Sequence, residues 1–195
     1  MRKLLLLGAS VALLANNNYS KLHTAIFQGD TDTIQKLVES STLEDIQKQT
    51  KAGVSPLHMA IKLGRIDIIT LLLSKEIDID TQDKHGNTPL HYAIATDRLD
   101  IVKLLINKEA DTEIGNDEGI TPLHQASYTG NIKTVTYLVD RGVKIDSLNA
   151  QGATPCQVAL ARSNMKVVSF LMELTQKECL KVPSNHYIEN NQTKE

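Results

Sequence analysis

The chain has 195 residues, with 23 acidic side chains against 21 basic ones and a formal net charge of −2. That balance leaves no basic excess to neutralise phosphates, so nucleic acid is not expected as a partner. Aromatic residues make up 4% of the chain and Trp is absent, which argues against a stacking platform for bases.

The first segment has the pattern of an export signal. Met-Arg-Lys at residues 1–3 is basic, Leu4 to Ala15 form an apolar run, and three Asn residues follow. This pattern is typical of a secretory signal peptide, here residues 1–15, and predicts a secreted or periplasmic protein. The run is too short to cross a bilayer as a helix, so no membrane span is expected in the mature chain. The alternative is an uncleaved apolar cap on the first repeat of a cytoplasmic protein.

A hexamer recurs every 33 residues through the body of the chain. Thr-Pro-Leu-His-Tyr-Ala at residues 88–93 has copies that start at Ser55, Thr121 and Thr154, and a weaker copy starts at Ser20. Ser or Thr before Pro favours a helix start, because the hydroxyl caps the first turn and Pro there needs no N–H. A second helix is predicted after each copy, since apolar residues follow at helical spacing. One such pair cannot cover its own apolar face, so neighbouring pairs must stack as a solenoid.

This period and hexamer resemble the ankyrin repeat. Asp-Lys-His-Gly-Asn-Thr at residues 83–88 resembles the turn of that family, and Ile-Val-Lys-Leu-Leu-Ile at residues 101–106 resembles its second helix. The resemblance implies a monomeric all-α ankyrin solenoid, with helix-turn-helix repeats joined by β-hairpin loops. The predicted units are an atypical N-terminal repeat at 18–53, repeats at 54–85, 86–118 and 119–151, a C-terminal capping repeat with a helical extension at 152–181, and a disordered tail at 182–195.

Some positions depart from the family pattern. Lys21 stands where Pro is expected, and the corner at residues 40–44 is longer by two residues. Glu76 and Glu109 stand where the family has a corner Gly, while Gly142 keeps it. A residue other than Gly costs about 1 kcal/mol in left-handed geometry, so the two Glu corners are predicted to be strained or remodelled.

Four histidines recur at one repeat position: His23, His58, His91 and His124. They suggest either a metal site or proton relay, or a structural role. Stacked helices lie about 8–10 Å apart, whereas ligands of one zinc ion lie about 2 Å from it, so successive histidines cannot share a metal. We therefore expect each ring to bond its own Ser or Thr and the neighbouring turn, as the family resemblance implies. No metal or cofactor is expected.

The two cysteines allow two interpretations. Cys156 and Cys179 can pair in an oxidising compartment, or Cys156 can be a small core residue at a position that elsewhere holds Leu. The second interpretation is favoured. Neither cysteine has a plausible His and carboxylate around it, and the motifs of phosphate loops, zinc proteases and serine hydrolases do not occur. The chain is therefore not expected to be an enzyme.

The family resemblance implies that a protein partner binds the concave face. This face comprises the hairpin tips and the exposed positions of each first helix: Met59, Lys62, Leu63, Lys84, His85, Tyr92, Thr96, Asp117, Glu118, Ile120, Gln125 and Tyr128. Exposed Tyr is enriched among interface anchors, so Tyr92 and Tyr128 are the predicted anchors. A chain rich in Lys, Asn and Ile with a bacterial-style signal resembles exported ankyrin proteins of host-associated bacteria, which implies an effector acting on a host protein. The alternative is a periplasmic regulator or chaperone that docks on a resident enzyme.

Overall fold

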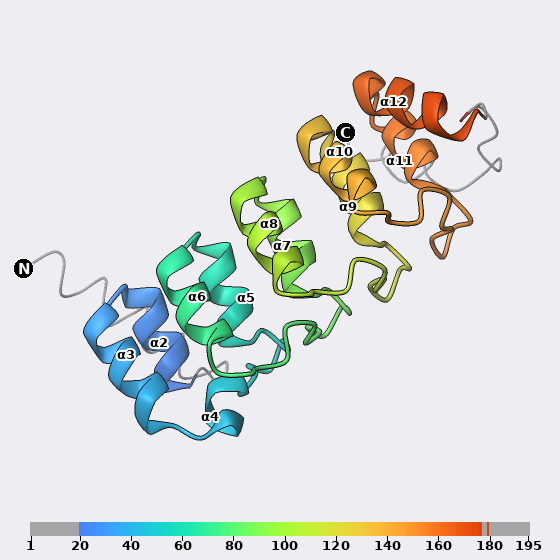
Figure 1. Cartoon of the computed structure of the whole chain (residues 1–195). Coiled ribbons are helices and arrows are strands. Elements are labelled where there is room, and N and C mark those ends of the chain that lie inside the picture. Colours follow the sequence, from blue (N-terminus) through green and yellow to red (C-terminus); the bar gives the residue numbers. More distant parts are fainter. Residues whose placement is uncertain (1–19, 177–178, 180–195) are drawn as a thin grey trace, which may run out of the picture.

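The computed structural model describes residues 20–176 and 179, which form pairs of helices stacked in a single row (Figure 1). The first helices of the pairs are α2 (Lys21–Gln28), α5 (Pro56–Lys62), α7 (Pro89–Ala95), α9 (Pro122–Thr129) and α11 (Pro155–Ala161). The second helices are α3 (Thr31–Ser40), α6 (Ile66–Leu73), α8 (Leu99–Asn107), α10 (Ile132–Asp140) and α12 (Met165–Thr175). Each pair falls inside one predicted repeat. The predicted signal peptide at 1–15 and the predicted tail at 182–195 lie outside the described residues.

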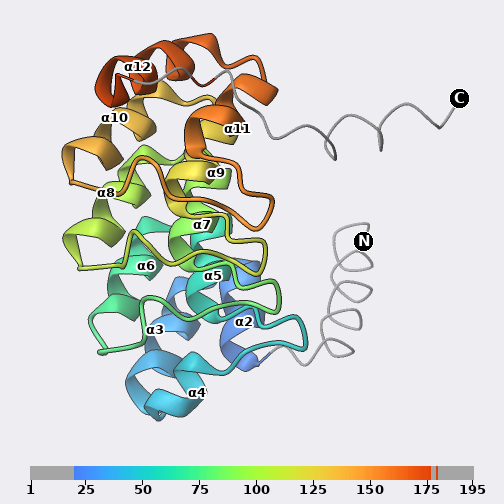
Figure 2. The same ribbon diagram turned by 90° about the vertical axis from the view of Figure 1, so that its right-hand side faces the viewer.

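The two sets of helices form two parallel columns (Figure 2). The first helices, which we call the inner helices, lie beside the projecting loops, and the second helices, the outer helices, lie farther from them. Residues 20–176 contain no β-strand, so the prediction of an all-α fold is confirmed. The loops between pairs are tight hairpin-shaped turns: in one of them, the N–H of Asp83 donates to the carbonyl of Asn87 at 2.9 Å.

The repeated hexamer forms the start of each inner helix. In α5, the Ser55 hydroxyl accepts from the N–H of His58, and the Nδ1 atom of His58 accepts from the N–H of Ser55, both at 3.3 Å. Pro56 occupies the first helical position, where a missing N–H leaves no gap in the helix. Ser20 and His23 form the same reciprocal cap in repeat one, so Lys21 in place of Pro does not prevent the helix from starting there.

The repeat histidines join each pair to the next one. The Nε2 atom of His58 lies 3.1 Å from the carbonyl oxygen of Asn87. The other three make the same contact: His23 with Val54, His91 with Ile120, and His124 with Ala153. Because a carbonyl only accepts, Nε2 carries the proton and Nδ1 accepts from the Ser55 hydroxyl at 2.9 Å. Both ring nitrogens therefore make hydrogen bonds within the fold, and the prediction of a structural role is confirmed.

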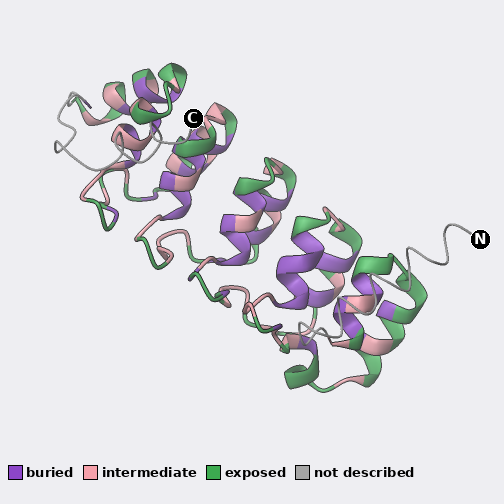
Figure 3. Ribbon diagram, turned by 180° about the vertical axis from the view of Figure 1, so that it is seen from behind, coloured by how far each residue is buried: buried purple, intermediate pink, exposed green. Residues whose placement is uncertain are grey.

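The core runs continuously between the pairs. Ile61, Ile69 and Leu72 of one pair are 0% exposed, as are Ile101 and Leu105 of the next. Buried residues concentrate where helices face one another, whereas the turns at the ends of the helices are exposed (Figure 3). Burying one such aliphatic side chain contributes about 1.5–3 kcal/mol, so the stacking of neighbouring repeats stabilises each pair.

The corners after the outer helices differ from repeat to repeat. Glu76 and Glu109 have φ values of 53° and 66°, in the left-handed region that favours Gly, and Gly142 has 81°. The prediction of strained Glu corners is thus confirmed in their backbone geometry. The longer corner of repeat one contains an additional short helix, α4 (Leu43–Gln47), which is capped by Thr42 and buries Ile46.

Replacing Glu76 and Glu109 by Gly is expected to raise the free energy of unfolding. Each replacement removes about 1 kcal/mol of left-handed strain, and the added freedom of Gly in the unfolded chain offsets part of that gain. Urea denaturation followed by far-UV circular dichroism measures the change. The matched control is Gly142→Ala: a Cβ there meets no atom within 4 Å, so only the backbone term acts and stability should fall by about 1 kcal/mol. A loss of stability in Glu109→Gly would contradict the strain argument.

The C-terminal end differs from one sequence prediction. Helix α12 ends at Thr175, Gln176 follows in the left-handed region, and most of the predicted helical extension to residue 181 lies outside the described residues. The expectation of an unpaired Cys156 was wrong, because Cys156 forms a disulfide with Cys179. The two Cα atoms lie 5.7 Å apart, within the range of a disulfide. Cys156 is buried, as predicted.

Candidate protein-binding surface

Backbone hydrogen bonds hold the tips of the loops in a row. The tips are residues 51–52, 84–85, 117–118 and 150–151. The N–H of Lys84 donates to Ala52, the N–H of Asp117 to His85, and the N–H of Ala150 to Glu118, at 2.9–3.0 Å. The side chains of Lys84, His85, Asp117 and Glu118 are exposed, as predicted. The tips therefore present a row of charged side chains on a fixed backbone.

The carboxylate of Asp83 anchors one of these tips. Its Oδ1 atom accepts from the N–H groups of His85 and Asn87 at 2.8 and 2.9 Å, and its Oδ2 atom accepts from the Tyr92 hydroxyl at 2.9 Å. Burial raises the pKa of Asp83, but these hydrogen bonds outweigh it and hold the pKa below its ordinary value. Asp83 is thus a charged acceptor within the loop, and little of its carboxylate is available to a partner.

Tyr92 belongs to this anchoring arrangement. Its ring is edge-on to that of His58, with centroids 4.8 Å apart, and the residue is half-buried. The prediction of an exposed anchor at Tyr92 does not fit this placement, because its hydroxyl and one ring edge are used between repeats two and three. Truncation of Tyr92 would therefore disturb the fold as well as any interface.

Three other predicted surface residues are less exposed than the sequence indicated. Met59 is 8% exposed, so its prediction as an exposed helix position was wrong; Gln125, at the same repeat position, is half-buried. Side chains at this position are thus buried or half-buried in repeats two to four. Ile120 is also half-buried. It stands at the repeat position of Asn87, whose Oδ1 atom accepts from the Nδ2 atom of Asn116 at 2.9 Å.

The substitution at Ile120 coincides with an unpaired polar group in the next loop. Asn149 corresponds to Asn116, yet its buried Nδ2 atom has no hydrogen-bond partner among the described residues. Ile120 stands at the position that Asn87 occupies one repeat earlier. Its side chain has no oxygen that could accept from the Nδ2 atom of Asn149, which explains why this donor is unpaired.

The last turns of the inner helices carry the exposed part of the surface. Lys62, Thr96, Leu63 and Tyr128 are exposed, the last two at 43% and 48%. The guanidinium carbon of Arg162 lies 4.4 Å from the centroid of the Tyr128 ring, a cation–π distance. Tyr128 is therefore held in place by the following repeat while its ring stays accessible.

The sequence interpretation missed Phe27. This residue, 50% exposed, lies in the last turn of the first inner helix, at the repeat position of Lys62 and Tyr128. Its number precedes Lys62 by 35 residues, the same offset as between the first two copies of the hexamer, so the signal was present in the spacing. Phe27, Leu63 and Tyr128 are the exposed apolar members of this surface.

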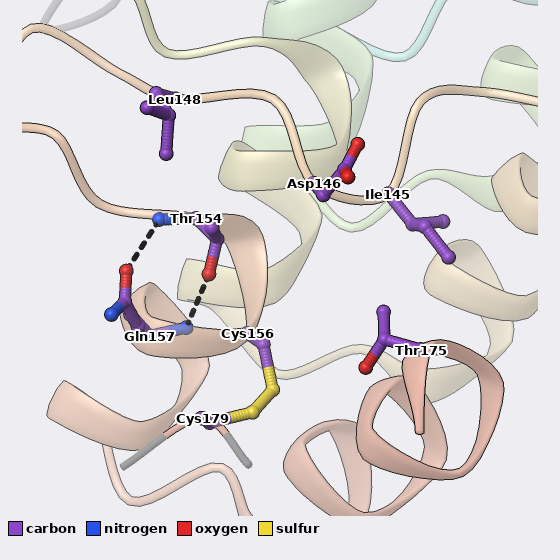
Figure 4. A pocket seen from close by; sticks show the side chains of 8 residues that line it. All are labelled: Ile145, Asp146, Leu148, Thr154, Cys156, Gln157, Thr175 and Cys179. Atoms are coloured by element: carbon purple, nitrogen blue, oxygen red, sulfur yellow. Dashed lines mark hydrogen bonds between the residues drawn. A yellow bond between two sulfur atoms is a disulfide. The ribbon is translucent and has the colours of Figure 1, made fainter. Parts of the chain in front are cut away.

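A hollow lined in part by the disulfide lies at the C-terminal end (Figure 4). It has a volume of about 250 Å³ and is lined by Ile145, Asp146, Leu148, Thr154, Cys156, Gln157, Thr175 and Cys179. Gln157 stands at the histidine position of repeat five, and its Oε1 atom accepts from the N–H of Thr154 at 2.8 Å. Both cysteines that line this hollow are in the disulfide, so neither offers a thiol nucleophile there.

The family model described as ankyrin repeats in three copies matches residues 2–83, 22–116 and 108–182. The chain belongs to the ankyrin repeat family. Ankyrin repeats are generally protein–protein interaction modules, and the family is typically non-catalytic. The first match begins inside the segment predicted to be a signal peptide, so export of this ankyrin protein stays a prediction. No curated protein sequence matches the chain. Within the described part of the chain, no helix has the length and apolar character required to span a bilayer.

Proposed function

We propose that this ankyrin repeat protein is non-catalytic and binds a partner protein with the inner face, which we define as the row of tips and the exposed last turns of the inner helices. The observation that carries the proposal is the set of exposed apolar side chains Phe27, Leu63 and Tyr128 on this otherwise polar surface. A row of tips held by backbone bonds limits the entropy lost on association. Apolar anchors with polar neighbours are the usual anatomy of an interface.

We also propose that the protein is exported. The disulfide supports this, because the chain has two cysteines and both are in it, and such bonds persist in oxidising compartments. One role is that of a bacterial effector acting on a host protein. The second is that of a periplasmic regulator or chaperone docking on a resident enzyme, and the disulfide favours this second role over action in a reducing cytosol.

Truncating Tyr128 is expected to weaken partner binding by about 1–3 kcal/mol with little change in stability. The ring is half exposed, so its loss removes contact area from a partner and little from the core. The full chain is used to capture proteins from bacterial envelope extract and from eukaryotic cell lysate. The affinity of the partner so identified is then measured for wild type, Phe27→Ala and Tyr128→Ala.

The matched control is Met165→Ala, which truncates a 57% exposed apolar side chain on an outer helix. It should bind like wild type, and all variants should melt close to wild type. A partner that binds Phe27→Ala and Tyr128→Ala as tightly as wild type would contradict the assignment of the inner face.

A further inference from the structure

The inner face is divided by charge along its length. In the N-terminal half, exposed Lys51 and Lys84 lie on adjacent tips, with His85 beside Lys84, and exposed Lys62 lies on the last turn of α5. In the third tip the exposed charges are Asp117 and Glu118. We call the first part, from α2 to the tip at residues 84–85, the basic half.

Carboxylates are absent from the described inner helices of the basic half. Neither α2 nor α5 contains Asp or Glu, and the same holds for α7, the next inner helix. The carboxylate at the second tip, Asp83, is 8% exposed and already accepts several hydrogen bonds. Acidic residues outnumber basic ones in the whole chain, so this half departs from the composition of the protein.

Two apolar side chains accompany these cations. Phe27 and Leu63 are 50% and 43% exposed, at the ends of α2 and α5, which pack against each other. Adjacent helices lie about 8–10 Å apart, so one short extended segment can reach both side chains. The hydrogen bond from Lys84 N–H to Ala52 places the tips that carry Lys51 and Lys84 side by side.

We infer that the basic half binds an acidic segment of the partner protein that carries an aromatic or aliphatic side chain. This inference rests on the proposed function and adds the chemistry of the partner. Lys51, Lys62 and Lys84 form no salt bridge among the described residues, so they can attract the carboxylates of a partner. Phe27 and Leu63 contact its apolar side chain. Asp117 and Glu118 repel an acidic chain, so the segment ends before the third tip. The few cations and the single aromatic ring suit a protein segment better than a nucleic acid.

Selection of random peptides displayed on phage against the immobilised full chain tests the inference. The selected peptides should contain more Asp and Glu than Lys and Arg, together with at least one aromatic or large aliphatic residue. A synthetic peptide from that pool should bind Lys62→Glu/Lys84→Glu roughly tenfold or more weakly than wild type, and its affinity should fall as salt is raised. The matched control is Lys133→Glu/Lys166→Glu, with two exposed lysines of outer helices, which should bind like wild type.

The possible outcomes separate this inference from the proposed function. Selected peptides that are neutral or basic, but that bind Tyr128→Ala more weakly, would overturn the acidic partner and leave the inner face as the binding surface. Acidic peptides that ignore Lys62→Glu/Lys84→Glu would also overturn the inference. A labelled oligothymidylate should not bind; binding that is lost in Lys62→Glu/Lys84→Glu would overturn the inference in favour of nucleic acid.

Discussion

Reducing the disulfide between Cys156 and Cys179 is expected to lower the melting temperature by roughly 6–12 °C. The bond closes a loop with a sequence separation of 23 residues. In the chain-entropy account, a loop of that length is worth about 3 kcal/mol through the unfolded state. The bond ties the chain beyond α12 to α11, so the loss should be concentrated in the last repeat. Thermal melts with and without a thiol reductant measure the total effect, and hydrogen exchange of α11 and α12 locates it.

The double variant Cys156→Ala/Cys179→Ala separates the disulfide from other effects of the reductant. Its melting temperature should lie near that of the reduced wild type, and the reductant should not lower it further. A second variant, Cys156→Leu/Cys179→Ala, places at 156 the residue that repeats two to four have at this position, as in Leu90. It should regain packing but not the covalent link. An unchanged melt of the wild type under reductant would show that the bond does not stabilise the repeat.

The fold was predictable because its determinants are local and recur. A Ser or Thr, a Pro and a His within four residues specify a cap, a first turn and a bond to the next loop, as Ser55, Pro56 and His58 do. Repetition every 33 residues then identifies the solenoid without knowledge of any distant contact. What differed arose at the ends: α4 occupies the longer corner of repeat one, and Gln176 turns the chain after α12. Terminal repeats lack a neighbour on one side, so the repeat pattern constrains them least.

The binding surface was less predictable because exposure depends on neighbouring repeats. Met59 and Tyr92 occupy one repeat position, and whether such a side chain faces solvent depends on the loop beside it. Asp83 draws Tyr92 into the loop through a hydrogen bond that the spacing does not reveal. The pairing of Cys156 with Cys179 likewise depends on a turn outside the repeat pattern. Lys62, Leu63 and Tyr128 are exposed as predicted, since they lie at or next to the C-terminal ends of their helices.

The stability of the protein is expected to fall between pH 6.5 and about 4 because of the repeat histidines. Burial lowers the pKa of His58 from 6.5 to about 4, and the hydrogen bond to Asn87 opposes this only partly. Burial also lowers the pKa values of His23, His91 and His124. Between these pH values the unfolded chain binds protons that the folded one excludes, so stability is complete above pH 6.5 and is lost as the pH falls. For His58 the loss is about 3 kcal/mol.

The hydrogen bonds of the His58 ring also predict that stability is lost as the pH falls. The Nδ1 atom of His58 accepts from Ser55, and a proton on it would break that contact and place a charge in the core. Asp83, whose pKa is also lowered, loses its contribution only below its ordinary value of 3.8, so it does not account for a loss in the range of the histidines. Burial raises the pKa of Asp80, so its protonation in the folded state increases stability as the pH falls. A loss of stability between pH 6.5 and 4 is therefore attributed to the buried rings.

Replacing His58 by Gln should reduce this acid sensitivity by about 3 kcal/mol between neutral pH and pH 4. Repeat five provides the precedent: Gln157 stands at the histidine position, and its Oε1 atom accepts from the N–H of Thr154 as a ring nitrogen does elsewhere. The variant should lose about 1 kcal/mol at neutral pH and titrate no group at this position. Urea midpoints across the pH range measure both effects. His85→Gln, an exposed change on a tip, should retain the acid sensitivity of the wild type. An undiminished loss of stability in His58→Gln would exclude His58 as a cause of the acid sensitivity.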